Sequence, residues 1–326
     1  MSKLPPFASR LLLAAAASLS FSSMRAAPPD AIVAADGSGQ YKTVRAAIDA
    51  CPQITHPGKH WTIFVKNGTY RELVYIQREK RFVTVVGEDA GKTIIAFDLY
   101  NDFPAPDGQP IATYRTPTIM LDADDFTFEN ITLANTAGRK GQALAIRIDG
   151  DRDVFRKVRF LGWQDTILTN RGRHYFEECY IEGATDFIFG GSTAFFERCH
   201  IHCLGNGYIT AASTPDFQKY GFVFSHCNIT GATPGVKTFL GRPWRDYAQT
   251  IFLNTEMSAV VRPEGWNNWG KPYAEKVATY AEFGNSGPGA TPDKRVPWSN
   301  QLTAELAATY SLENVLAGAD GWNPTK

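Results

Sequence analysis

The chain has 326 residues, of which 44% are hydrophobic, and its 33 basic side chains balance 33 acidic ones. This composition predicts a packed core and excludes an intrinsically disordered chain. A formal net charge of zero gives no reason to expect a nucleic-acid partner. A chain of this length forms one large domain or two small ones, and an elongated β architecture of this size usually folds as one unit.

The first 27 residues have the features of a secretory signal. Lys3 and Arg10 precede a run rich in leucine and alanine that continues to Phe21, and we expect cleavage near Ala26 or Ala27. The run is too short to span a bilayer, and no later segment is long enough, so we expect no membrane contact. The sequence therefore predicts an exported protein, extracellular or, if its source is bacterial, periplasmic, in which residues 28–326 form a single domain.

One helix precedes a long series of strands. Val44, Ala47, Ile48 and Cys51 recur at helical spacing, which predicts an amphipathic helix over residues 43–51 that caps one end of the fold. From Trp61 onward, short β-branched and aromatic runs broken by Gly, Asn and Asp predict strands. Beyond residue 270 this pattern fades, and we expect short helical segments over residues 301–308 and 312–316.

A repeat anchored on phenylalanine runs through the middle of the chain. Apolar residues recur at the anchor and at three and five residues beyond it, and successive anchors are 27, 21, 20, 28 and 28 residues apart. The anchors are Phe128, Phe155, Phe176, Phe196, Phe224 and Phe252. Such coils are typical of a parallel β-helix, because each coil buries its inward side chains only by stacking on its neighbours. We therefore predict an all-β fold, a single-stranded parallel β-helix with an N-terminal capping helix and a C-terminal tail of helices and loops; a β-sandwich is the alternative.

Two aspartates occupy the same position in successive coils. Asp165 lies ten residues after Phe155, and Asp186 lies ten residues after Phe176. Equivalent positions of adjacent coils are about 4.7–4.9 Å apart, so the register predicts stacked carboxylates. Their pKa values should then separate, leaving one ionised nucleophile and one protonated general acid. The alternative is that both are turn residues bonded to their own backbone.

The cysteines follow the same register. Cys179, Cys199 and Cys227 each lie three residues after an anchor, and the distance between neighbouring strands suits a disulfide. For an exported protein we predict a bridge between Cys179 and Cys199, with Cys227 as a competitor for Cys199, and we expect Cys51 in the core.

The segment C-H-I-H-C at residues 199–203 resembles a metal site at first sight. Strand alternation sends Cys199 and Cys203 to one face and His200 and His202 to the other. Four ligands then cannot converge without a bulge, so we expect no metal.

Five sequence blocks point to a known family. They are G-T-Y-R-E at 68–72, G-Q-A-L-A at 141–145, G-W-Q-D-T at 162–166, D-F-I-F-G at 186–190 and L-G-R-P-W at 240–244. In this order they resemble the pectin methylesterases, the pectinesterase family of carbohydrate esterases, over about residues 31–269. The resemblance implies a right-handed β-helix and a single catalytic domain over residues 28–326.

The resemblance also implies roles for four side chains. Asp186 would attack the ester carbonyl at C6 of a methylated galacturonate. Asp165 would protonate the departing methanol and then accept a proton from the hydrolytic water. Gln142 and Gln164 would donate amide hydrogens to the developing oxyanion, a task that suits neutral donors.

Three further residues would surround this centre. Arg242 would orient Asp186 and lower its pKa, so that Asp165 keeps the proton. Trp244 would stack on the sugar, and Phe189 is a second candidate for sugar contact. Plant members usually place an aromatic residue soon after Q-D-T, where this chain has Ile167 and Leu168 instead.

The predicted activity is removal of methyl esters from homogalacturonan (pectin) by a monomer that needs no metal or organic cofactor. A glycoside hydrolase or polysaccharide lyase is a second hypothesis, because two carboxylates about 5 Å apart also suit retaining glycosidases. A family relative acting on another ester or thioester is a third, and a catalytically silent carbohydrate-binding β-helix is a fourth. The sequence contains no G-x-S-x-G motif, so a serine hydrolase is not expected.

Overall fold

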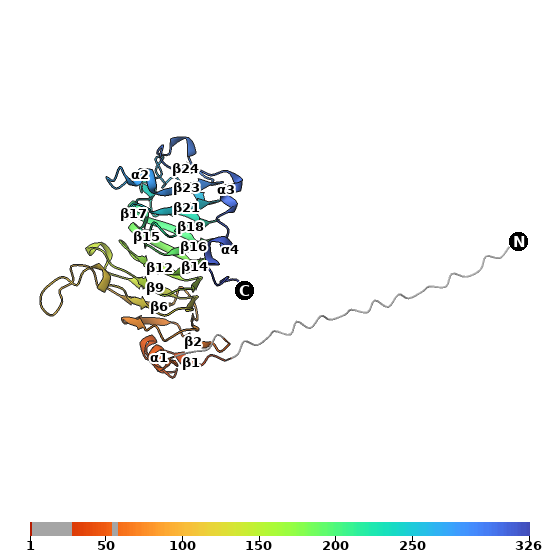
Figure 1. Cartoon of the computed structure of the whole chain (residues 1–326). Helices are drawn as coiled ribbons and strands as arrows, with labels where there is room; N and C mark the ends of the chain where they lie inside the picture. Colours follow the sequence, from red (N-terminus) through yellow and green to blue (C-terminus); the bar gives the residue numbers. More distant parts are fainter. Residues whose placement is uncertain (2–27, 54–57) are drawn as a thin grey trace.

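The computed structural model describes Met1 and residues 28–53 and 58–326. The predicted secretory signal therefore lies, apart from Met1, outside the described residues. Short parallel strands follow one another around a common axis and stack coil upon coil into the column seen in Figure 1. The predicted parallel β-helix is confirmed, and the alternative of a β-sandwich is wrong.

One wall of the column is an 11-stranded sheet in which every neighbouring pair is parallel. Its strands are β1 (Ala31–Val33), β2 (Trp61–Val65), β5 (Val83–Gly87), β8 (Thr127–Glu129), β11 (Asp153–Arg156), β14 (Arg173–Glu177), β16 (Thr193–Glu197), β18 (Phe222–Ser225), β21 (Gln249–Leu253), β23 (Thr279–Phe283) and β24 (Asn300–Gln301).

The remaining walls belong to a 13-stranded sheet. One of its two rows contains β3 (Gly68–Arg71), β6 (Thr93–Phe97), β9 (Thr132–Asn135), β12 (Arg159–Leu161), β19 (Asn228–Gly231) and β22 (Glu256–Met257). The other contains β4 (Val74–Ile76), β7 (Ile119–Leu121), β10 (Ile146–Ile148), β13 (Ile167–Thr169) and β20 (Thr238–Gly241). The long strands β15 (Tyr180–Gly190) and β17 (His200–Ala212) pair with strands of both rows and so join them.

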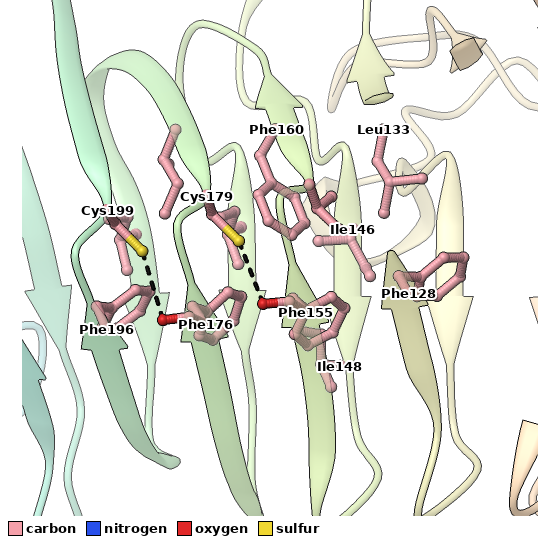
Figure 2. Close-up of a cluster of buried hydrophobic side chains, with 14 of the residues drawn as sticks. Phe128, Leu133, Ile146, Ile148, Phe155, Phe160, Phe176, Cys179, Phe196 and Cys199 are labelled. Atoms are coloured by element: carbon pink, nitrogen blue, oxygen red, sulfur yellow. Dashed lines mark hydrogen bonds between the residues drawn. The ribbon is translucent and has the colours of Figure 1, made fainter. Parts of the chain in front are cut away.

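The predicted phenylalanine anchors form a continuous stack in the core (Figure 2). Consecutive rings from Phe155 to Phe252 lie parallel, with centroids 4.4–4.7 Å apart, and Phe128 stacks on Phe155 at 6.0 Å. Each such pair contributes about 0.5–1.5 kcal/mol beyond the burial of its apolar area. The stack therefore fixes the register of the coils that contain the candidate site.

Each of these coils turns a corner two residues after its anchor. The corner residues have left-handed backbone, with φ between 48° and 53°. They are Asn130, Lys157, Glu178, Arg198, His226 and Asn254. A left-handed residue other than glycine costs roughly 1–2 kcal/mol. The chain accepts this cost because the corner turns the next residue, three beyond the anchor, into the core.

The helices lie at the ends and on the outside of the column. Helix α1 (Val44–Ala50) buries Val44, Ala47 and Ile48 at the N-terminal end, and the Thr43 hydroxyl caps it by accepting a hydrogen bond from the backbone of Ala46 at 3.2 Å. This helix and α4 (Leu312–Leu316) confirm the predictions. Helix α3 (Ala304–Ala308) begins later than predicted, because residue 301 pairs as a strand in β24, and the short helix α2 (Ala274–Val277) was not predicted.

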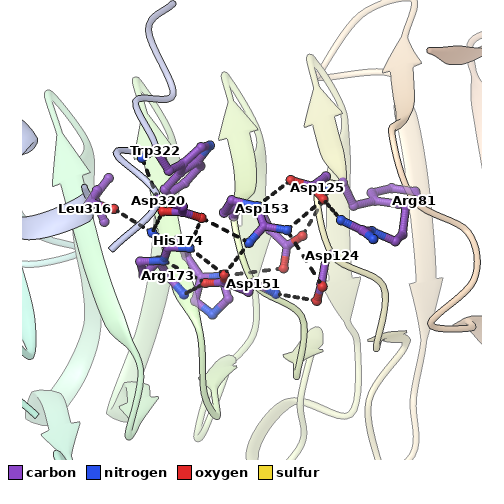
Figure 3. Close-up of polar contacts among 12 residues, drawn as sticks. Arg81, Asp124, Asp125, Asp151, Asp153, Arg173, His174, Leu316, Asp320 and Trp322 are labelled. Atoms are coloured by element: carbon purple, nitrogen blue, oxygen red, sulfur yellow. Dashed lines mark hydrogen bonds and ion pairs between the residues drawn. The ribbon is translucent and has the colours of Figure 1, made fainter. Parts of the chain in front are cut away.

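The C-terminal tail covers the outer face of the 11-stranded sheet. Apolar side chains on that face, such as Tyr175 and Phe195, pack against Val315 and Leu316 of α4. Beyond α4, Asp320 binds Arg173 through two hydrogen bonds of 2.6 and 2.9 Å, and the same guanidinium also binds a neighbouring Asp (Figure 3). The tail is thus attached by apolar contact and by ion pairs.

The predicted disulfide between Cys179 and Cys199 is wrong, because all five cysteines are free thiols. The stacking that suggested the bridge is present, but each sulfur points toward the preceding coil (Figure 2). Cys179 Sγ donates to the carbonyl oxygen of Phe155 at 3.4 Å, and Cys199 Sγ donates to that of Phe176 at 3.5 Å. A disulfide requires the two side chains to point toward each other, whereas these two point in the same direction along the stack.

The C-H-I-H-C segment alternates as predicted. Cys199 and Cys203 are buried, while His200 and His202 are partly exposed on the other face, where both rings contact the Thr230 hydroxyl at 2.7 Å. Within the described part of the chain, no three His, Cys, Asp or Glu side chains are grouped so that they could hold a metal ion. None of the described helices is long and apolar enough to cross a membrane.

Candidate active site

Asp165 and Asp186 lie on adjacent coils, as the register predicted. Asp186 belongs to β15, and Asp165 lies two residues before β13, whose Ile167 pairs with Ile188 of β15. Two residues before this pair on each coil are Asp165 and Asp186, which therefore lie opposite each other. Both have left-handed backbone, with φ of 63° and 50°, and both are about 5% exposed, at 5% and 6%. This conformation is uncommon for residues other than glycine, although aspartate adopts it more readily than most.

Burial and the negative charge of Asp186 raise the pKa of Asp165 well above its usual range, and the positive charge of Arg242 opposes this rise only in part. Burial also raises the pKa of Asp186, whereas the hydrogen bonds and charge of Arg242 lower it. We expected Arg242 to bring the pKa of Asp186 down, but burial outweighs it. The order within the pair is still the predicted one, because Arg242 binds Asp186 directly and no cation in the described part of the chain binds Asp165.

Arg242 holds Asp186 in a bidentate ion pair. Its Nε donates to Oδ1 at 2.9 Å and its Nη2 to Oδ2 at 2.5 Å. The guanidinium lies between two aromatic rings, 3.8 Å from the centroid of Tyr208 and 3.6 Å from that of Trp269. A planar guanidinium stacked in this way is fixed in one orientation, and so is the carboxylate it binds.

Gln142 and Gln164 lie opposite each other on adjacent coils. A parallel bridge pairs the two glutamines, a second pairs Gln164 with Thr185, and the backbone amide of Ala143 donates to the carbonyl of Gln164 at 3.1 Å. Both glutamine side chains line a cavity of about 270 Å³ that also contains the two carboxylates. Its lining residues are Thr113, Tyr114, Gln142, Gln164, Asp165, Asp186, Phe189, Arg242, Trp244 and Trp269.

Trp244 and Phe189 form one wall of this cavity. Their rings contact at 5.7 Å between centroids, and Trp244 is partly exposed whereas Phe189 is only 5% exposed. Phe189 packs in a small apolar cluster with Leu168. The structure therefore makes Trp244 the accessible surface and Phe189 its support.

All seven site residues predicted from the sequence meet in this cavity. Three further residues that line the cavity were not predicted: Thr113 and Tyr114 come from a loop without any repeat, and Trp269 packs on Arg242. Tyr208, which packs on Arg242 from another coil, was also not among the predicted site residues. Trp269 could have been suspected as the last residue of the resembling region, and the T-Y pair at 113–114 gave no signal.

Comparison with known proteins identifies the family of this chain. The pectinesterase family matches residues 30–319. Pectinesterase 31 of Arabidopsis thaliana is 39% identical over 284 residues, which cover 85% of this chain and 89% of the relative. The structure of a pectin methylesterase from carrot superposes with a TM-score of 0.83 at 31% identity, covering 89% of this chain and 94% of that one.

A second pectin methylesterase structure, solved in complex with a hexasaccharide, has a TM-score of 0.78 at 29% identity and covers 92% of this chain and all of its own. These matches extend over nearly the whole β-helix and include the coils that hold both aspartates. The chain belongs to the pectinesterase family and is a pectinesterase, a hydrolase of carboxylic esters.

Proposed function

We propose that this enzyme removes methyl esters from the galacturonate units of pectin with Asp186 as nucleophile and Asp165 as acid and base. The observation that supports this assignment best is the bidentate ion pair between Arg242 and Asp186 beside a second buried carboxyl. A carboxylate is a weak nucleophile, and a fixed, ionised carboxylate next to a protonated one meets both needs of ester cleavage.

In the first step, one Asp186 oxygen attacks the C6 carbonyl carbon of the esterified galacturonate. The electron pair of the carbonyl bond moves onto its oxygen, where Gln142 and Gln164 donate amide hydrogens. The bond from C6 to the methoxy oxygen then breaks, and the Asp165 proton passes to that oxygen as methanol leaves. An anhydride between Asp186 and the galacturonate remains.

In the second step, a water molecule attacks the C6 carbonyl of the anhydride. Asp165, now ionised, accepts a proton from this water, and the bond between C6 and the Asp186 oxygen breaks. Asp186 returns to its ionised form, held by Arg242, and the galacturonate leaves as a free acid that ionises in water. The enzyme ends with the same proton on Asp165 as it had at the start.

The substrate we propose is methyl-esterified homogalacturonan, with Trp244 as the surface on which a sugar ring stacks. One relative has been solved in complex with a hexasaccharide, which supports an oligosaccharide as ligand. An exported monomer would meet this polymer outside the cytoplasm. Gel filtration together with N-terminal sequencing of the secreted protein tests the monomeric state and the removal of residues 1–27.

One assay tests the proposed reaction against its alternatives. Highly methylated pectin should yield methanol in step with new carboxyl groups, without new reducing ends and without unsaturated products. Reducing ends would indicate a glycoside hydrolase, and unsaturated products a lyase. Faster turnover of an acyl thioester or an unrelated methyl ester than of pectin would favour a different substrate.

A further inference from the structure

The side chain of Gln142 is held by a residue outside the predicted set. The hydroxyl of Thr113 lies 2.6 Å from Gln142 Oε1 and donates a hydrogen bond to it. Thr113 begins the short 3-10 helix η1 (Thr113–Arg115), in the long loop between β6 and β7 that projects from the column in Figure 1. Thr113 and Gln142 both line the catalytic cavity.

This hydrogen bond decides which end of the amide faces the reaction. An amide has one accepting end and one donating end, and only the donating NH₂ can stabilise an oxyanion. The carboxylates in the cavity attract the NH₂ and repel Oε1. Thr113 supplies a donor for Oε1, and among the described residues no acceptor takes the NH₂ of Gln142, so the NH₂ stays available to a ligand.

The loop also binds the backbone of Gln142. The backbone N–H of Asn101 donates to the backbone carbonyl of Gln142 at 2.9 Å, and the side-chain Oδ1 of Asn101 accepts from the backbone N–H of Gln142 at 3.0 Å. This close approach requires the glycine at 141, because a Cβ there would lie 2.1 Å from Asn101 Oδ1 and the backbone has a φ of 150°. The loop is thus fixed to the β-helix at the residue whose side chain Thr113 binds.

The backbone just before Thr113 is itself unusual. Ala112 has a φ of 63°, and its amide donates to the carbonyl of Asn101 at 2.9 Å. A residue other than glycine in this region costs about 1–3 kcal/mol and persists only where its surroundings over-determine it. The strained turn at Ala112 directs Thr113 toward Gln142.

We propose that Thr113 is a positioning residue, which acts on the reaction through Gln142. Its hydroxyl keeps the NH₂ of Gln142 directed at the oxyanion, with Asn101 and the loop as support. Gln164 offers a contrast, because its side chain accepts no hydrogen bond from any described residue and donates none to one. The inference rests on the proposed role of Gln142 as an oxyanion donor.

A double-mutant cycle tests it by measuring kcat and KM for methanol release from highly methylated pectin. Thr113→Val keeps the volume and removes the donor, and it should lower kcat about 5- to 50-fold, a part of the roughly 10²–10³-fold effect of deleting an oxyanion donor. KM should change less than about threefold, and Thr113→Ser should retain at least about half of the wild-type kcat. In a Gln142→Ala background, Thr113→Val should have less than about a twofold further effect.

Thr118→Val is the matched control, because the Thr118 hydroxyl belongs to the same loop and donates to the carbonyl of Ala134 at 2.8 Å, away from Gln142. It should lower the melting temperature without lowering kcat. Should Thr113→Val fail to fold, Thr113→Ala takes its place in the cycle.

The inference is overturned if Thr113→Val leaves kcat unchanged, if Thr113→Ser does not restore it, or if the loss is equal in both backgrounds. These outcomes are separable from failure of the proposed function, because an unchanged kcat in Gln142→Ala alone would remove the oxyanion role itself.

Discussion

Arg242 binds Asp186 through both carboxylate oxygens, at 2.9 and 2.5 Å, while among the described residues no cation pairs with Asp165. Two buried carboxyls on adjacent coils are thereby made unequal. The charge of Arg242 favours the ionised form of Asp186, whereas burial and the negative charge of Asp186 favour the protonated form of Asp165. This one ion pair therefore gives two aspartates different protonation states and so different roles in the reaction.

Replacing Arg242 by Gln should move the acid limb of the pH profile. Burial raises the pKa of Asp186 and Arg242 opposes this rise, so the pKa of Asp186 goes up further when the guanidinium is removed. Activity requires ionised Asp186 and is lost as pH falls through its pKa. The acid limb of kcat/KM should therefore shift to higher pH by about one unit or more, with a loss in kcat of at least about tenfold. An unchanged acid limb would mean that Arg242 does not control the ionisation of the nucleophile.

Asp165 should set the alkaline limb. It must carry a proton when methanol leaves, so kcat/KM should fall as pH rises through its raised pKa, giving a bell-shaped profile. Asp165→Asn removes the acid and should lower kcat by about 10²–10⁴-fold. The residual activity of this variant should no longer fall at the pH where the wild-type activity falls. If the alkaline limb stays in place, a group other than Asp165 causes it.

Trp244→Ala should weaken polymer binding more than it slows the chemistry. Trp244 is the accessible ring of the wall that Phe189 supports, and it makes no hydrogen bond to either aspartate. We expect KM for pectin to rise about tenfold, as loss of a stacked aromatic contact of about 1–2 kcal/mol implies. Turnover of a small methyl ester should change less than about threefold. Equal losses on both substrates would place Trp244 in the chemistry instead.

The cysteines should behave as buried thiols. Burial raises the pKa of Cys51 to about 11 and that of Cys203 to about 12, and it raises the pKa values of Cys199 and Cys227 well above their usual range. A thiol reagent should therefore find almost no reactive group in the native enzyme and all five after denaturation without reductant. Dithiothreitol should leave the melting temperature unchanged. Three titratable thiols after denaturation, instead of five, would show that one disulfide is present.

The spacing of residues along the chain predicted the β-helix and the aspartate pair because both depend on register. Six phenylalanines at coil-length intervals can be read from the sequence, and they stack as that reading requires. The same reasoning failed for Cys179 and Cys199. Register gives the separation of two backbones but does not give the direction of two side chains, and these sulfurs follow carbonyls of the preceding coil.

The remaining site residues could not be predicted because they depend on contacts between distant segments. Thr113 reaches Gln142 from a loop with no repeat, across 29 residues. Tyr208 and Trp269 enclose Arg242 from separate coils. The pairing of Arg242 with Asp186, 56 residues along the chain, was predicted from the family resemblance and not from the register. Such contacts arise only when the coils stack.

The most direct test of the account is methanol release from highly methylated pectin by Asp186→Asn. This substitution keeps the shape of the side chain and its backbone conformation but removes the nucleophilic charge, so kcat should fall by at least about 10³-fold while the melting temperature and circular dichroism stay close to those of the wild type. Asp216→Asn makes the same chemical change at an exposed aspartate and should leave turnover unaltered. Retention of more than about a tenth of wild-type methanol release by a folded Asp186→Asn enzyme would contradict the assignment of Asp186 as the nucleophile.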